Sequence, residues 1–329
     1  MAIHIGRRAL IAGLGGTAFG LPFGARAQTM GAGKPIRMVV GFGAAGATDI
    51  AARVLSGKLG KTLGQQVYVD NRTGAGGTIA TEQVALSAPD GLTLLATPLA
   101  NAANETLFKN FRYTYDEYFT AVAPVADTNN VVAVHPSLHV KTIGELIALA
   151  KSRPPGAILA GSPGVGTASH LANELFNQMA GVKMTSVQYR GGGDVMKDLV
   201  SGQIKVDIAP IPTVLPFLQN GSVMAIATTG LKRDVMLPDV PTVAESGVPG
   251  FDVRLWIGIL APKATPRPIV ERLAGATAQA LAAPDLKAAY AKQGLNPLPG
   301  GPDDFAAFYR SEVAKWRKVI LATGMSLEK

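Results

Sequence analysis

Short apolar runs alternate with amphipathic segments along most of this chain. The apolar run 36–40 leads into a glycine-rich turn, and apolar residues then recur at helical spacing over 50–61. Apolar runs at 66–69 and 92–95 predict two more strands, with a helix starting near 74–78 between them. Strands separated by helices and turns favour a mostly parallel sheet with helices on both faces. The pattern therefore predicts an α/β fold.

The second half of the chain repeats the opening unit. A strand at 158–160, a glycine-rich turn at 161–167 and a helix at 168–179 follow one another in the same order as the elements at the start. Two such units in two halves predict two lobes whose helix N-termini meet at one cleft. We place lobe 1 at residues 28–129 and 252–329, and lobe 2 at residues 130–251.

Other segments fit this plan. Thr142 and Glu145 form a capping box that starts a helix through residue 151. Residues 97–104 are predicted to be a polar loop after the third strand, where open α/β sheets bind ligands. The remaining predicted elements are strands at 122–126, 131–134, 184–188, 204–208, 223–228 and 253–260, and helices at 211–219, 266–281, 284–293 and 302–323.

Residues 1–27 are predicted to be an export signal. Arg7 and Arg8 precede an apolar stretch at 9–23, and the residues 25–27, Ala-Arg-Ala, offer a small-residue cleavage site. The apolar stretch is too short and too rich in glycine for a membrane span. The paired arginines suggest the twin-arginine route, and the general secretory route stays open. We expect export into a bacterial periplasm.

Charge and cysteine content exclude several classes of protein. The formal charge is +8, and removal of residues 1–27 leaves 28 Lys and Arg against 23 Asp and Glu, or +5. This surplus is spread along the chain without a basic block, so we expect no nucleic-acid partner. The chain has no cysteine, which excludes disulfides, thiolate nucleophiles and cysteine-ligated metals.

The first glycine-rich turn predicts an anion site. Glycine permits close backbone approach, and a helix N-terminus presents free N–H groups and the positive end of the helix dipole. Two interpretations are open at this point. The pattern Gly41-x-Gly43-x-x-Gly46 also fits a dinucleotide-binding turn, with Asp70 at the distance expected for a ribose contact.

Catalytic constellations are weak in this sequence. Ser162 lies in a near match to a nucleophile elbow, but the next residue is Pro163, which has no N–H for an oxyanion hole. The loop 161–167 has no lysine before Thr167 to reach a phosphate. No histidine and carboxylate cluster has the spacing of a metal site. The sequence therefore favours binding over catalysis.

Several motifs occur in the order found in one known family. They are Pro35-Ile36-Arg37, the segments 45–49 (AGATD), 69–77 (VDNRTGAGG), 88–95 (APDGLTLL), 161–162 (GS), 166–172 (GTASHLA), 187–191 (VQYRG) and, most specifically, 237–245 (LPDVPTVAE). On these motifs the chain resembles the Bug-type extracytoplasmic solute receptors, the substrate-binding family of tripartite tricarboxylate transporters. The resemblance runs from residue 35 to the C-terminus.

The resemblance implies a two-lobed periplasmic-binding-protein fold of type II that closes on a small carboxylate. Each lobe would hold a mixed, mostly parallel sheet flanked by helices. The implied ligand-binding residues are Phe42, Gly43, Ala44, Ala45, Gly46, Ala47, Thr48 and Asp49 in the first loop, Thr97 and Asn101, Ser162, Gly164, Val165, Gly166, Thr167 and His170 in the second loop and helix, and Tyr189, Gly191 and Asp194.

The chain departs from the family pattern at one informative place. Where the family commonly has an Asp-Asn pair after a strand, this sequence has Ala209-Pro210. A ligand ammonium would lose a partner there, so we expect an amino acid to be disfavoured.

The predicted function is a periplasmic receptor that captures a small carboxylate and delivers it to the membrane components of a tripartite tricarboxylate transporter. We expect a monomer without catalytic residues, metal or cofactor. The alternative is an exported NAD(P)-dependent oxidoreductase that uses the first glycine turn for its dinucleotide.

Overall fold

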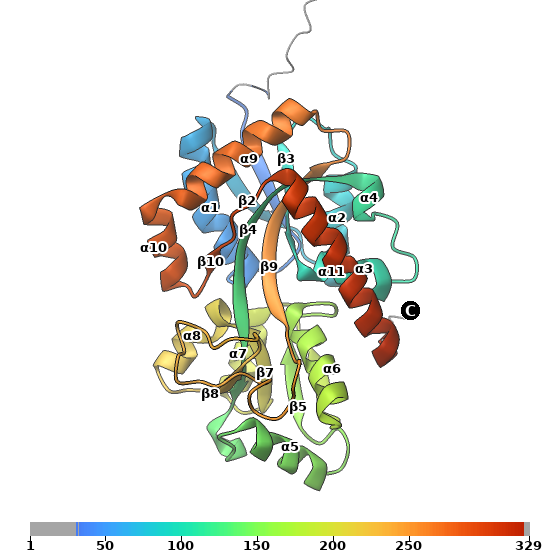
Figure 1. Ribbon diagram of the computed structural model, residues 1–329, viewed down its shortest axis with the longest axis vertical. Coiled ribbons are helices and arrows are strands. Elements are labelled where there is room, and N and C mark those ends of the chain that lie inside the picture. The colour runs from blue at the N-terminus through green and yellow to red at the C-terminus, as the bar shows by residue number, and fades with distance from the viewer. Residues whose placement is uncertain (1–30, 32, 326–329) are drawn as a thin grey trace, which may run out of the picture.

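The computed structural model describes residues 31 and 33–325, and the predicted export signal lies outside this range (Figure 1). The first part of the chain alternates strands and helices, as the apolar pattern predicts. Its elements are β1 (Ile36–Val40), α1 (Ala47–Leu63), β2 (Val67–Asn71), the short helix η1 (Ala75–Gly77), α2 (Thr78–Ala85), β3 (Thr93–Pro98), α3 (Leu99–Leu107) and α4 (Tyr115–Tyr118).

The middle part repeats this alternation after one long strand. Its elements are β4 (Phe119–Val134), the short helix η2 (Pro136–Leu138), α5 (Ile143–Ser152), β5 (Leu159–Ser162), α6 (Ala168–Ala180), β6 (Thr185–Gln188), α7 (Gly192–Val200), β7 (Val206–Pro210), α8 (Ile211–Gln219) and β8 (Met224–Thr228). The chain ends with β9 (Arg254–Pro262), α9 (Arg267–Ala282), α10 (Pro284–Lys292), β10 (Asn296–Pro297) and α11 (Pro302–Thr323).

The strands follow one path in the order β2-β1-β3-β9-β4-β7-β5-β6, and β8 and β10 both pair with β4. β1 is parallel to β2 and β3, and β5 is parallel to β6 and β7. β4 and β9 are antiparallel to each other and lie between these two parallel groups. The fold is thus a two-lobed α/β arrangement in which each lobe has a mixed sheet with flanking helices.

β4 connects the two lobes. In Figure 1 it runs as one long ribbon from the upper to the lower half of the molecule, beside β9. β4 pairs with β9 as far as Asn129 and with β7 from Asn130 onward. This change of partner falls at the predicted crossing between residues 129 and 130, and the full division of the chain into lobes stays a prediction.

The prediction of two strands at 122–126 and 131–134 is wrong, because β4 continues through the polar residues between them. Two of those polar residues, Thr128 and Asn130, are buried with partners instead of forming a turn. Thr128 Oγ1 donates to the Gly294 carbonyl at 2.7 Å, and Asn130 Nδ2 donates to the Val253 carbonyl at 3.1 Å. Both side chains are fully buried. Partners so distant in sequence leave no local signal.

The predicted polar loop at 97–104 is also wrong, because α3 begins at Leu99. Its asparagines are buried and donate hydrogen bonds to neighbouring elements. Asn101 donates to Thr81 Oγ1 at 2.7 Å, and Asn104 donates to the Gly76 carbonyl at 2.9 Å. Other predictions are confirmed, since α8 and α11 have the predicted bounds and Thr142 and Glu145 form the capping box of α5. No described helix has the length and apolar character needed to cross a bilayer.

A buried carboxylate fastens α11 to β9. Glu312 Oε2 accepts hydrogen bonds from the indole N–H of Trp256 at 2.8 Å and of Trp316 at 3.2 Å. Trp256 lies in β9, which pairs with β3 and β4, and its ring packs edge-on against Phe305, Phe308 and Tyr309 of α11. The tryptophans are therefore part of the core, as we expect of such side chains.

We predict that Glu312→Ala lowers the free energy of unfolding by about 2–3 kcal/mol, because two buried indole N–H groups lose their acceptor. Glu312→Gln keeps an acceptor oxygen in place and should cost less than half as much. Urea denaturation of the two variants checks this, and equal losses would contradict the assigned role of the oxygen.

Candidate ligand-binding site

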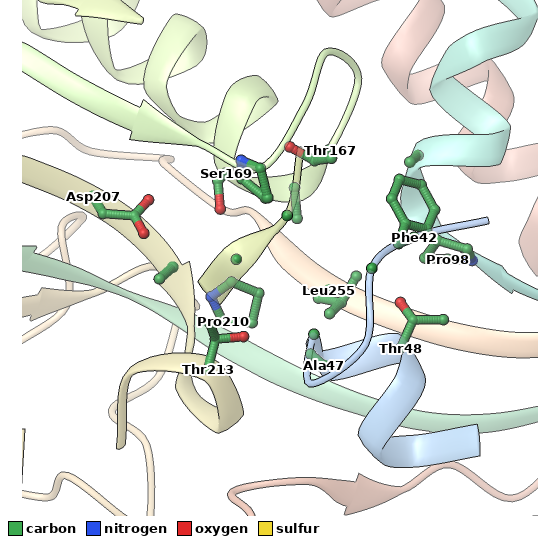
Figure 2. Close-up of a pocket in the computed structure, with 18 residues that line it drawn as sticks. Phe42, Ala47, Thr48, Pro98, Thr167, Ser169, Asp207, Pro210, Thr213 and Leu255 are labelled. Atoms are coloured by element: carbon green, nitrogen blue, oxygen red, sulfur yellow. The ribbon is translucent and has the colours of Figure 1, made fainter. Parts of the chain in front are cut away.

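Two glycine-rich loops meet between the lobes. The first joins β1 to α1 and the second joins β5 to α6, so each ends at a helix N-terminus. Residues of both loops line one cavity of about 70 Å³ (Figure 2). One water needs about 10–15 Å³ of such space, so the cavity has room for several waters or for a small organic acid.

Five helices begin at this cavity. For each of α1, α3, α6, α7 and α8, the lining includes a residue of the first turn or the residue that precedes the helix. The first N–H groups of a helix lack an intrahelical partner, and the helix dipole places partial positive charge there. The residues that line the cavity include no lysine or arginine. The arrangement is therefore suited to hold an anion through backbone N–H groups.

The first loop is held in shape by Asp49. This carboxylate is 2% exposed and accepts hydrogen bonds from the Ala45 N–H at 3.0 Å, from Arg53 Nε at 2.9 Å and from Asn71 Nδ2 at 2.9 Å. Burial alone would raise the pKa of Asp49, but the hydrogen bonds from Arg53, Asn71 and Ala45 outweigh it and hold the pKa below its usual range. Ala45 has a left-handed φ of 61°, which is uncommon for alanine. Asp49 thus fixes a strained turn from behind the cavity.

Asn71 is a positioning residue that the predicted site omits. Besides Asp49, its amide donates to the Phe42 carbonyl at 3.0 Å. It therefore joins the end of β2 to both ends of the first loop. The motif 69–77 contains this asparagine, so the sequence carried the signal without showing its contact.

The second loop is held by hydroxyl groups. Ser162 Oγ and Thr167 Oγ1 both donate to the Gly164 carbonyl, at 2.9 Å and 2.7 Å. Thr167 Oγ1 also caps α6 by accepting the His170 N–H at 3.3 Å. The His170 Nδ1 atom accepts the Gly166 N–H at 3.2 Å, and burial lowers the pKa of His170 to about 4. His170 is therefore a neutral acceptor that shapes the loop.

The structure brings part of the predicted ligand set to the cavity wall. The predicted residues that line it are Phe42, Gly43, Gly46, Ala47, Thr48, Thr167 and Gly191. Figure 2 shows Phe42, Thr48 and Thr167 around this space. The first loop also comes close to the start of α7 there, since a Cβ placed on Gly43 would lie 3.7 Å from the Gly191 Cα. Their predicted role as ligand contacts stays a prediction.

The other predicted residues lie outside this lining. Gly164 and Tyr189 border a neighbouring pocket that also contains Phe42. The Tyr189 hydroxyl donates to Asp198 at 2.8 Å, and Asp194 is exposed on α7. The remaining residues do not line the cavity either. Ala44 and Ala45 are exposed members of the first loop, and the others support the loops or lie in the core; they are Asp49, Thr97, Asn101, Ser162, Val165, Gly166 and His170.

Asp207 and Ser169 line the cavity and are absent from the predicted set. Asp207 lies on β7 and is 2% exposed, and Ser169 lies at the start of α6 and is 1% exposed. Burial raises the pKa of Asp207 to about 8. The run 204–208 reads only as a buried strand, so its one acid gave no local sign of facing a cavity.

The dinucleotide features have other roles in the structure. Asp70 forms ion pairs with Arg37 at 2.6 Å and with Arg72 at 3.0 Å. A Cβ on Gly41 would lie 2.9 Å from the Gly77 Cα, so glycine is needed there for close packing of two backbone segments. Within the described residues, no group of three or more His, Asp or Glu side chains is arranged to hold a metal ion.

This fold, with a cavity where helix N-termini of both lobes meet, is that of a periplasmic binding protein. Residues 51–325 match the family model described as the tripartite tricarboxylate transporter family receptor. The chain belongs to this family, which confirms the resemblance drawn from the motifs.

Solved structures agree with this assignment. A Rhodopseudomonas palustris protein, Rpa4515 with adipate, is 33% identical with a TM-score of 0.86, over 89% of this chain and 98% of that one. The periplasmic binding protein BugD is 33% identical with a TM-score of 0.85, over 90% and 99% of the two chains. MatC of R. palustris with bound malate is 32% identical with a TM-score of 0.82, over 87% and 99%. The oxidoreductase alternative finds no support among these relatives.

We predict that Asp49→Ala frees the first loop. Loss of the acceptor should lower the free energy of unfolding by about 1–3 kcal/mol and release the Ala45 amide to solvent. Arg53→Ala is the matched control, because it removes the exposed partner and leaves the Ala45 hydrogen bond in place. Hydrogen exchange at Ala45 checks this, and slow exchange in Asp49→Ala would contradict the role given to Asp49.

We predict that Asp207→Asn changes the pH dependence of stability. The usual Asp pKa is 3.8, so the unfolded chain loses this proton well below pH 7, whereas the folded chain keeps it up to about pH 8. The free energy of unfolding of the native protein, minus that of Asp207→Asn, should therefore fall as pH rises between these two pKa values. The expected slope is about 1.4 kcal/mol per pH unit. Urea denaturation at pH 5, 6, 7 and 8 measures it, and a constant difference would contradict a protonated Asp207.

Proposed function

We propose that this protein is a periplasmic receptor that binds a small carboxylate in the cavity between its lobes and delivers it to the membrane components of a tripartite tricarboxylate transporter. The observation that carries the proposal is the convergence of the N-termini of α1 and α6, from two different lobes, on a cavity lined by no lysine or arginine. Membership of the receptor family and the adipate and malate bound to its relatives support the same ligand class.

The mechanism follows from the two opposed loops. A carboxylate oxygen at the N-terminus of α1 accepts backbone N–H groups of lobe 1, and the other oxygen accepts those of α6 in lobe 2. Neither lobe alone completes this shell, so the ligand binds the closed arrangement more tightly and shifts the population toward it. The crossings near residues 129 and 251, the first of which lies within β4, are the segments where the chain bends.

This proposal includes the finer expectations from the sequence. The receptor acts without catalysis, cofactor or metal, and as a monomer. It reaches the periplasm through the signal in residues 1–27, by the twin-arginine or the general secretory route. The lobe boundaries near residues 129 and 251 and the ligand contacts of the two loops are part of the same proposal.

A ligand panel tests the proposed function. Thermal unfolding of the protein without residues 1–27 should shift upward with one class among di- and tricarboxylates, aromatic acids and amino acids. A ligand at a hundred times its Kd stabilises by about 2.7 kcal/mol. A shift with NAD or NADP and with no carboxylate would overturn the receptor assignment.

We predict that Thr167→Ala weakens binding of that ligand at least tenfold, because the residue caps α6 and holds the second loop. Thr142→Ala is the matched control, since Thr142 caps α5 in the same way and does not line the cavity. Both should cost about 1 kcal/mol of stability. Calorimetric titration measures the ligand affinity of both variants. Equal affinities would contradict a role of the second loop in ligand binding.

A further inference from the structure

The cavity wall formed by β7 and α6 contains an acid with one unpartnered oxygen. Asp207 is the one ionisable side chain among the residues that line the cavity. Within the described part of the chain, its Oδ1 atom makes no hydrogen bond to protein. Such buried polar atoms are rare in native structures and call for a partner. Figure 2 shows the Asp207 carboxyl group at the cavity, on the opposite side from Phe42 and Thr48.

A second unpartnered group lies on the same wall. Ser169 Oγ is buried and also makes no hydrogen bond to the described protein groups. The two side chains come from different elements, β7 and α6, that pack against each other. The wall therefore presents two buried polar atoms that lack a protein partner.

The position of Asp207 in the sheet explains how it reaches the cavity. Asp207 pairs with Ala133 of β4 and with Gly161 of β5, and Ala209 follows it on the same face of β7. Both Asp207 and Ala209 line the cavity. Asp207 therefore supplies an acid on this wall, although Ala209 stands where the family commonly has one. The expectation that an amino acid is disfavoured rested on that replacement.

Among the described residues, no cation contributes to the pKa shift of Asp207. Its pKa shift has burial as its one cause, with no contribution from a charged neighbour. The neighbouring β5, α8 and residues 131–134 of β4 carry no titratable side chain. The titratable residues on the other packed elements are His170 and Glu174 on α6, Asp194, Lys197 and Asp198 on α7, and Tyr189 and Arg190 after β6.

We propose that Asp207 and Ser169 bind the protonated amine of an amino acid whose carboxylate lies at the N-termini of α1 and α6. An ammonium group has three donors, which match the carboxylate and hydroxyl acceptors on this wall. A zwitterion complements both parts of the cavity, the positive helix ends and the unpaired acid. This inference rests on the proposed function and narrows its ligand class.

Matched pairs of ligands test this inference. Aspartate against succinate, and glutamate against glutarate, differ by the amine alone. Calorimetric titration at pH 7 should give at least tenfold tighter binding to the amino acid in one of these pairs. Asp207→Asn should abolish that preference while it still binds the compound without the amine. Ser169→Ala should reduce the preference and provides a second variant if Asp207→Asn fails to fold.

The pH dependence separates two roles for the acid. If an ammonium ion binds ionised Asp207, close to one proton is released at pH 7, and affinity rises roughly tenfold between pH 6 and pH 7. Asp207→Asn should show neither effect. If Asp207 instead donates its proton to a second carboxylate, affinity falls as pH rises, and this inference is overturned.

The failures are distinguishable. Binding of succinate or glutarate with no gain from the amine would overturn the amino-acid inference and leave the carboxylate receptor in place. Binding of no compound with a carboxylate in the panel would overturn both.

Discussion

The structure depends on bringing the N-termini of helices from both lobes to one space, because the first N–H groups of a helix lack an intrahelical partner. Each glycine-rich loop must turn sharply after a buried strand to place its helix start there. The chain meets this requirement by tying the loops from behind, through Asp49 and Asn71 in lobe 1 and through Ser162 and Thr167 in lobe 2. In this arrangement the partial positive charge that attracts an anion comes from backbone N–H groups, and the loops determine the shape of the cavity.

In the proposed receptor, the two lobes contribute different chemical groups to the ligand-binding cavity. Lobe 1 offers Phe42, Gly46 and Thr48, a surface without ionisable side chains, whereas lobe 2 adds Asp207 and Ser169. Each lobe of the proposed receptor presents only part of the shell, so ligand binding and lobe closure are coupled through β4. The hydrogen bond from Trp256 to Glu312 fastens β9, the neighbour of β4, to α11 and so keeps the lobe 1 side of β4 rigid.

The sequence predicts those features that leave a local pattern. Strand and helix periodicity, the capping box at Thr142 and the two glycine-rich loops all give such a pattern, and the motifs indicate the family. Long-range contacts do not. Thr128 and Asn130 appear as a turn because their partners, Gly294 and Val253, are far away in sequence. The sequence does not indicate Asp207 for the same reason, since its place in the cavity wall depends on how β7 packs against β5 and α6.

The central claim is that one ligand is held by both lobes at once, and the distance between the lobes tests it most directly. The chain has no cysteine, so Leu86→Cys on lobe 1 and Met179→Cys on α6 of lobe 2 place two dyes at exposed positions. We predict that saturating carboxylate shifts the energy transfer between the dyes to a single closed value, at the concentrations that give thermal stabilisation. Tight binding with an unchanged distance distribution would contradict the claim, because it would mean that one lobe holds the ligand alone.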